Sequence, residues 1–95
     1  MIEISISENK IDLKGHAGKK ASDGIDRACA AVSALTNNLI NSLQDLTKDK
    51  IATQSEIGRI RIEWEGLSEK GKLLIDSWFL AMTDINREYN CIRFI

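Results

Sequence analysis

The sequence predicts an α+β fold in which two helices pack on a mostly antiparallel five-stranded sheet, in the order ββαββαβ. Short segments in which apolar and polar residues alternate occur near the start, in the middle and at the end of the chain, and this period of two is typical of half-buried strands. Two longer segments carry apolar residues at steps of three and four positions, which is the pattern of an amphipathic helix. The order of these segments predicts the order of the elements.

Two strands open the chain, and we expect them to form a hairpin. Isoleucines at alternate positions of residues 2–7 predict the first strand. Residues 8–10 predict a tight turn, and the second strand begins at Ile11 and Leu13 and ends at Gly15. The chain can bend at this glycine.

A polar loop and a long helix follow the hairpin. Residues 17–24 are small and polar, which predicts a loop. Either Asp23 or Asp26 is expected to cap the helix. With Asp26 as the cap, Cys29 lies in the first turn, where the helix dipole favours an anion, whereas with Asp23 it lies deeper and gains less. The predicted apolar face of the helix comprises Ile25, Ala28, Val32, Leu35, Leu39, Leu43 and Leu46.

Two more strands, a second helix and a closing strand are expected in the second half of the chain. Residues 51–55 and 59–65 read as strands, with a turn at residues 56–58. Ser68 is expected to cap the second helix, and Cys91–Ile95 suits a closing strand because it is short and apolar. The predicted apolar stripe of the second helix comprises Leu74, Ile75, Trp78, Met82, Ile85 and Tyr89.

Length and composition predict one small domain over residues 1–95. Lys and Arg total 13 and Asp and Glu 14, so the net charge of −1 excludes a broad basic surface. We therefore expect no direct binding to nucleic acid, with a local basic patch possible at Lys14, Lys19 and Lys20. Apolar runs are too short to cross a bilayer, and no secretory signal opens the chain. The two cysteines favour a reducing compartment, which predicts a cytoplasmic protein without a membrane partner.

Cys29 and His16, the only histidine, are the residues that point to chemistry. A thiol is a good nucleophile only as the thiolate, so it needs a base or a positive field nearby. His16 can supply the base and the start of the helix the field. The alternative is a buried structural Cys29, because free cysteines are commonly buried. Strand parity directs His16 away from the core unless Gly15 changes the phase.

Three further predictions concern the surroundings of this pair. Asp26 caps the helix, orients the imidazole of His16, or does both. Ser33 follows Cys29 by one helical turn, so it either forms hydrogen bonds in the site or packs within a face of small residues. We expect no metal and no cofactor, because Cys91 lies far along the chain without the spacing of a ligand set.

Two segments together resemble a known signature. Gly15–Ala17, with the sequence GHA, and Gly24–Leu35, with the sequence GIDRACAAVSAL, are separated by a short loop that contains glycine. They resemble the signature of the bacterial ribosomal-processing cysteine proteases, the Prp family. The resemblance extends over essentially the whole chain, because the small size, the order of elements and a second helix ending in Arg87–Asn90 also fit.

The resemblance implies a cysteine endopeptidase that removes the short N-terminal extension of large-subunit ribosomal protein twenty-seven, cutting after an aromatic pair. It assigns the catalytic roles to Cys29 and His16, and places the motif aspartate at Asp26 and the motif serine at Ser33. It also implies a homodimer and a mobile loop that orders around the substrate. The residues of that loop are Gly18, Lys19, Lys20, Ala21, Ser22, Asp23 and Gly24.

Two other functions remain open. One is a non-catalytic, ribosome-associated module of the same fold. The other is a related protease that trims a phage protein or another cytosolic protein. Retention of rRNA that is sensitive to salt and unchanged in Cys29→Ala and His16→Ala would favour the first of these, and substrate profiling distinguishes the second.

Overall fold

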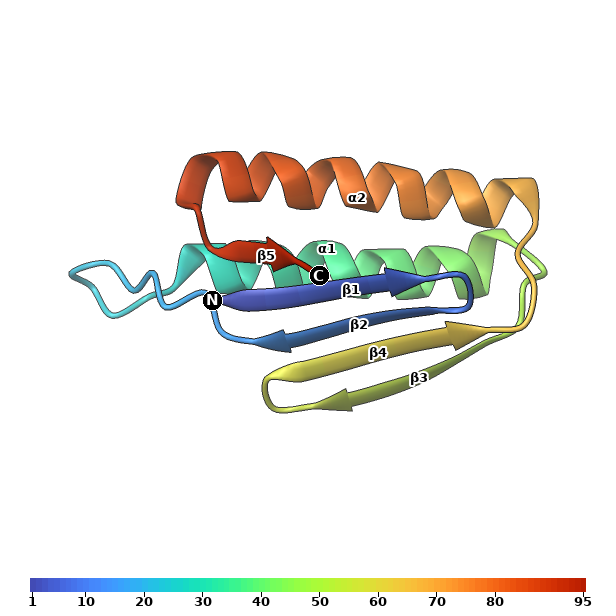
Figure 1. Cartoon of the computed structure of the whole chain (residues 1–95), viewed down its shortest axis with the longest axis horizontal. Helices are drawn as coiled ribbons and strands as arrows, with labels where there is room; N and C mark the ends of the chain where they lie inside the picture. The colour runs from blue at the N-terminus through green and yellow to red at the C-terminus, as the bar shows by residue number, and fades with distance from the viewer.

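The computed structural model describes residues 1–95 and has the predicted order of elements (Figure 1). The elements are β1 (Ile2–Ser7), β2 (Lys10–Gly15), α1 (Arg27–Leu46), β3 (Ile51–Glu56), β4 (Arg59–Trp64), α2 (Glu69–Tyr89) and β5 (Ile92–Phe94). The strands form one five-stranded sheet in the order β3-β4-β2-β1-β5. Only β1 and β5 are parallel, which confirms the predicted mostly antiparallel α+β fold.

The core lies between the sheet and the two helices, which also pack against each other. Alternate residues of the central strands point into it: Ile2 and Ile4 from β1, Ile11 and Leu13 from β2, and Ile62 from β4 are all buried. This alternation follows from the strand period of two, which sends successive side chains to opposite faces. The predicted isoleucine pattern is therefore confirmed as the inner face of the sheet.

The apolar face of α1 differs from the prediction at three residues. Ile25 precedes the helix and is 52% exposed, while Leu35 and Leu46 are 40% and 66% exposed. Thr36 takes an inner position instead: it is fully buried, and its hydroxyl accepts a hydrogen bond from the indole N–H of Trp78 at 3.0 Å. A buried indole needs an acceptor, so a threonine on this face stabilises the contact between the helices.

The second helix begins and ends as its terminal residues predict. Ser68 caps α2 by accepting a hydrogen bond from the N–H of Gly71 at 3.1 Å. Asn90 adopts a left-handed conformation with φ of 49° and ends the helix. Cys91 is buried just before β5, which is shorter than the predicted strand Cys91–Ile95. Neither helix is long and apolar enough to cross a membrane.

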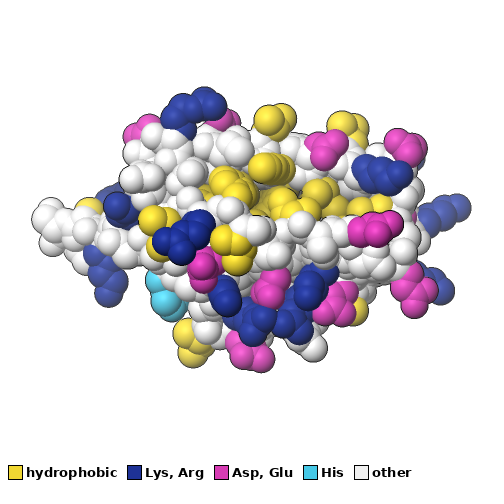
Figure 2. All heavy atoms as spheres, in the orientation of Figure 1, with side chains coloured by type: hydrophobic (Ala, Val, Ile, Leu, Met, Phe, Trp, Pro, Cys, Tyr) yellow, Lys and Arg dark blue, Asp and Glu magenta, His cyan; other side chains and the backbone are white.

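The outer face of the sheet is charged. Figure 2 shows dark blue Lys and Arg side chains interleaved with magenta carboxylates on this face. Asp12 lies among them and accepts hydrogen bonds from the guanidinium of Arg59, with Nη2 to Oδ2 at 2.7 Å. These hydrogen bonds lower the pKa of Asp12, and the charges of Arg59 and Arg61 add to the effect. Both signs of charge thus alternate on this face, whereas a band of hydrophobic side chains lies above it in the same view.

Candidate active site

Cys29 lies in the first turn of α1, because Asp26 caps this helix. Oδ1 of Asp26 accepts a hydrogen bond from the backbone N–H of Cys29 at 2.9 Å. Of the two predicted caps, Asp26 is therefore the one formed, and the thiol stands where the helix dipole favours negative charge. The hydrogen bonds from Cys29 and then from Lys19 lower the pKa of Asp26, so this cap is ionised at neutral pH.

The sulfur of Cys29 is only half-buried, so the alternative of a sealed core cysteine does not hold. Sγ accepts a hydrogen bond from the backbone N–H of Ala17 at 3.1 Å. The other thiol, Cys91, is fully buried, and burial raises its pKa. The two free cysteines thus differ in access to solvent.

His16 follows a sharp change of backbone direction at the end of β2. Gly15 has a φ of 99°, and a Cβ at this residue would lie 2.5 Å from the carbonyl oxygen of Met1, so only glycine fits. The carbonyl oxygen of His16 accepts a hydrogen bond from the N-terminal amine of Met1 at 2.6 Å. His16 is exposed, as strand parity predicts, but it lines a cavity rather than standing free on the outer face.

The imidazole packs against the β3–β4 turn. Gly58 in this turn has a φ of 76°, and a Cβ placed there would lie 3.1 Å from Nε2 of His16. The N–H of Gly15 donates to the carbonyl oxygen of Gly58 at 2.8 Å, which ties the turn to the end of β2. The imidazole therefore packs against the backbone of the turn in a space that a side chain at residue 58 would fill.

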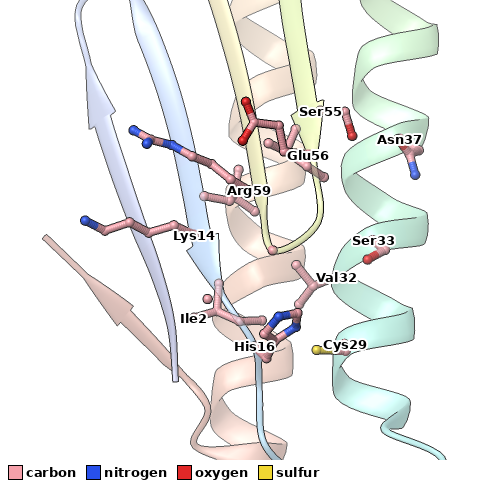
Figure 3. Close-up of a pocket in the computed structure, with 14 residues that line it drawn as sticks. Ile2, Lys14, His16, Cys29, Val32, Ser33, Asn37, Ser55, Glu56 and Arg59 are labelled. Atoms are coloured by element: carbon pink, nitrogen blue, oxygen red, sulfur yellow. The ribbon is translucent and has the colours of Figure 1, made fainter.

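The two candidate catalytic residues share one cavity of about 280 Å³ (Figure 3). Its walls come from the end of β2, the β3–β4 hairpin and the first turns of α1. Figure 3 shows the ring of His16 beside the sulfur of Cys29, on facing elements. Besides Cys29, the polar residues on its walls include His16, Ser33, Asn37, Ser55 and Glu56.

Ser33 and Asp26 are placed differently with respect to this cavity. Ser33 lines it one turn beyond Cys29, as the helical spacing predicts. Asp26 forms no hydrogen bond or ion pair with His16, and its two carboxylate oxygens accept from the backbone N–H groups of Cys29 and Lys19. Of its two predicted roles, Asp26 fills that of the cap.

The loop 18–24 extends beyond the start of α1 (Figure 1), and none of its residues lines the cavity. Asp23 forms an ion pair with Arg27 at 2.6 Å instead of capping the helix. The N–H of Lys19 donates to Oδ2 of Asp26 at 3.0 Å, which attaches the loop to the helix cap. The loop is thus joined to the start of α1 rather than to the cavity.

Several cavity residues have no signal in the sequence. Glu56 and Gly58 read only as part of a turn, and nothing in the sequence singles out Asn37 or Ser55. The pairing of β4 with β2 is what brings the hairpin to the histidine. A lone glycine in a two-residue turn that follows an alternating strand is the one local feature that could have drawn attention to Gly58. No three His, Cys, Asp or Glu side chains are grouped so as to hold a metal ion.

A thiol in the first turn of a helix, sharing a cavity with a histidine, is the arrangement of enzymes that use a cysteine nucleophile. The family model described as cysteine protease Prp matches residues 1–92 of this chain. The chain therefore belongs to the cysteine protease Prp family, as its motifs predict. No curated protein matches it.

Solved structures with this fold include proteins from S. aureus and Streptococcus mutans. The essential ribosomal processing protease Prp from S. aureus, in complex with a covalently linked product peptide, has a TM-score of 0.84 at 22% identity, over 98% of this chain and 94% of that chain. Its complex with a substrate peptide has a TM-score of 0.82 at 20% identity, over 99% and 95%. The protein SMU.848 from Streptococcus mutans has a TM-score of 0.76 at 26% identity, over 98% and 89%.

Proposed function

We propose that this chain is a cysteine endopeptidase that removes the short N-terminal extension of large-subunit ribosomal protein twenty-seven, with Cys29 as the nucleophile and His16 as the base. The observation that carries the proposal is that Cys29 and His16 line one open cavity at the start of α1. Family membership and the S. aureus protease, which is described with substrate and product peptides, support a peptide as the substrate.

Acyl transfer proceeds in two halves. The imidazole of His16 takes the proton of the Cys29 thiol, and Sγ attacks the scissile carbonyl carbon. The tetrahedral intermediate collapses as His16 gives that proton to the leaving amine, which leaves a thioester on Cys29. A water molecule, deprotonated by His16, then attacks the thioester carbon, and the thiol is re-formed as the carboxylic acid product departs.

Backbone N–H groups provide the electrostatic part of the mechanism. The N–H of Ala17 donates a hydrogen bond to Sγ at 3.1 Å, so it stabilises negative charge that develops on the reacting sulfur. The N–H of Cys29 is occupied by Asp26 and is therefore not free for a substrate oxygen. One donor aimed at a developing oxyanion is typically worth about 3 kcal/mol.

The remaining parts of the proposal concern assembly and place of action. A homodimer and a cytoplasmic location are both expected for a member of this family that processes a ribosomal protein. The loop 18–24 is proposed to order around the bound extension. Sedimentation or light scattering of the purified chain measures the first of these directly, and a monomer would contradict it.

The test of function is cleavage of a peptide that spans the extension junction of the ribosomal protein, followed by mass spectrometry. We expect one cut by the wild-type chain and none by Cys29→Ala or His16→Ala. Leu73→Ala, on the exposed face of α2 away from the cavity, is the matched control and is expected to cleave as the wild type does. A peptide that stays intact with the wild type, or a cut that survives in Cys29→Ala, would contradict the proposal.

Two outcomes would assign a different function. Retention of rRNA that is sensitive to salt, and is unchanged in both catalytic variants, would indicate a non-catalytic ribosome-associated module. Cleavage of other cytosolic or phage proteins, with the ribosomal junction left intact, would indicate a related protease with another substrate.

A further inference from the structure

The strand β3 forms a long open edge of the sheet. It pairs only with β4, and its residues from Ala52 to Glu56 are all exposed. Natural sheets usually block such an edge with lysines, prolines or a bulge. The sequence of β3, IATQSE, contains no lysine and no proline. The opposite edge is covered in part by the three residues of β5.

The ladder determines which backbone groups of β3 are free. Trp64 in β4 donates its N–H to the carbonyl oxygen of Asn9, on the β2 side, at 3.0 Å. Successive residues of a central antiparallel strand direct their backbone N–H and C=O groups to opposite neighbouring strands. The β4 residues that lie an odd number of positions from Trp64 therefore bond to β3. Their partners in β3 are Ala52, Gln54 and Glu56. The N–H and C=O groups of Thr53 and Ser55 therefore point to the open edge.

This edge leads into the candidate active site. Ser55 and Glu56, at the end of β3, line the same cavity as Cys29. The opposite wall is formed by Ser33 and Asn37 of α1, whose side chains are small or polar, and Figure 3 shows Ser55 and Asn37 on facing elements. The end of the open edge, at Ser55, and Cys29 thus border the same cavity.

We propose that the substrate binds as an added strand on the open edge of β3, pairing with the backbone of Thr53 and Ser55 while its scissile carbonyl reaches Cys29. The proposal rests on the protease function above and specifies how an extended peptide is held. Addition of a strand uses backbone hydrogen bonds for affinity and alternate side chains for specificity. It therefore explains how a cavity whose lining is mostly polar or small can hold an extended peptide.

The first test changes the peptide. Junction peptides are synthesised with a single N-methyl group at each successive residue on both sides of the scissile bond. We expect cleavage by the wild-type chain to fall about tenfold or more at alternate residues on one side, where an N–H points to β3, and to change little at the residues between them. Uniform effects along the peptide would overturn the proposal.

The second test changes the edge. Thr53→Pro removes an outward N–H, which an edge strand tolerates because the ladder to β4 does not use it. We expect kcat/KM to fall about tenfold, while iodoacetamide labels Cys29 at the wild-type rate, since a small reagent needs no docking strand. Ile6→Pro removes an outward N–H beyond β5 on the opposite edge and is the matched control. Equal cleavage by Thr53→Pro and the wild type would overturn the proposal and leave the protease function intact.

A binding measurement separates failure of the proposal from failure of the function. The junction peptide is added to Cys29→Ala, and the exchange of backbone amides is followed by NMR. Slower exchange at Thr53 and Ser55 supports strand addition even if the wild type leaves the peptide uncut, and unchanged exchange overturns it. Protection of the same amides without peptide, increasing with protein concentration, would assign the edge to a second copy of this chain and would also overturn it.

Discussion

Asp26 accepts a hydrogen bond from the backbone N–H of Cys29 at 2.9 Å, and the same carboxylate accepts a second from the N–H of Lys19 at 3.0 Å. One side chain thus joins the start of α1 to the loop that follows His16. Because the N–H of Ala17, just before this loop, donates to the sulfur of Cys29, the position of the loop and that of the sulfur depend on each other.

The first prediction separates the two hydrogen bonds of Asp26. Asn is as good a helix cap as Asp but has a single carbonyl oxygen, so Asp26→Asn keeps the bond to Cys29 and loses the bond to Lys19. We expect Asp26→Ala to lower the melting temperature more than Asp26→Asn, and both to make loop 18–24 easier to cleave by trypsin at Lys19 and Lys20. Equal melting temperatures for the wild type and Asp26→Ala would contradict the role of the cap.

The second prediction concerns the pH dependence of this cap. Hydrogen bonds from Cys29 and Lys19 hold the pKa of Asp26 below its ordinary value of 3.8. A carboxyl whose pKa is lowered by folding stabilises the folded state above its unfolded pKa and loses this effect as the pH falls through the folded value. The difference in melting temperature between the wild type and Asp26→Ala should therefore be constant down to about pH 4 and shrink below it. A difference that stays unchanged at pH 2 would contradict this.

The third prediction concerns the packing of Gly58 against His16. Gly58→Ala places a methyl group 3.1 Å from Nε2 and strains a backbone with φ of 76°, so the imidazole must move. We expect kcat to fall about tenfold or more, since a displacement of about 1 Å in a catalytic group can cost a hundredfold. Gly66→Ala, where an added Cβ meets no atom within 4 Å, is the matched control. Full activity in Gly58→Ala would exclude a positioning role for this turn.

The elements could be predicted because each depends on local patterns. Alternating isoleucines predict β1, and Ser68 predicts the start of α2. The apolar pattern does not determine which positions of α1 are buried, because tertiary contacts decide them. Thr36 is buried since it meets the indole of Trp78, whereas Leu35, one residue earlier, faces outward. No pattern of apolar residues within one helix contains that information.

Only the part of the site that forms one short stretch of sequence could be predicted. The motif predicts His16 and Cys29 as the candidate catalytic residues, and the structure brings both to one cavity. The wall opposite them comes from the β3–β4 hairpin, which lies far along the sequence and reaches the site because β4 pairs with β2. Gly58 and Ser55 therefore belong to the cavity through sheet order, which the sequence alone does not specify.

The fourth prediction distinguishes the two thiols. Cys29 is half-buried at the cavity, whereas Cys91 is fully buried and its pKa is raised by burial, so it has little access to a reagent and little thiolate. We expect iodoacetamide to add one group per folded chain, at Cys29, and a second only in urea. Intact-mass spectrometry measures this, and Cys29→Ala should remain unlabelled when folded. Early labelling at Cys91 would contradict the assignment.

The fifth prediction concerns a glycine that a helix would ordinarily disfavour. Gly71 lies in the first turn of α2, where alanine would be preferred by about 1 kcal/mol on intrinsic propensity. The carboxylate of Asp49 lies over its Cα, in the space a Cβ would need. The same carboxylate accepts hydrogen bonds from the backbone N–H and the hydroxyl of Ser68, at 2.9 and 2.8 Å. Alanine at this residue must therefore displace Asp49 from the helix cap.

A double-mutant cycle can separate the gain in helix propensity from the loss of the Asp49–Ser68 hydrogen bonds. Gly71→Ala alone should lower the melting temperature, because the loss of the Asp49–Ser68 hydrogen bonds outweighs the gain in helix propensity. In the Asp49→Ala background the carboxylate is absent, so Gly71→Ala should raise the melting temperature. A change of sign between the two backgrounds would show that Gly71 is required by the cap. The same sign in both would show that the methyl group is accommodated and that Asp49 moves at little cost.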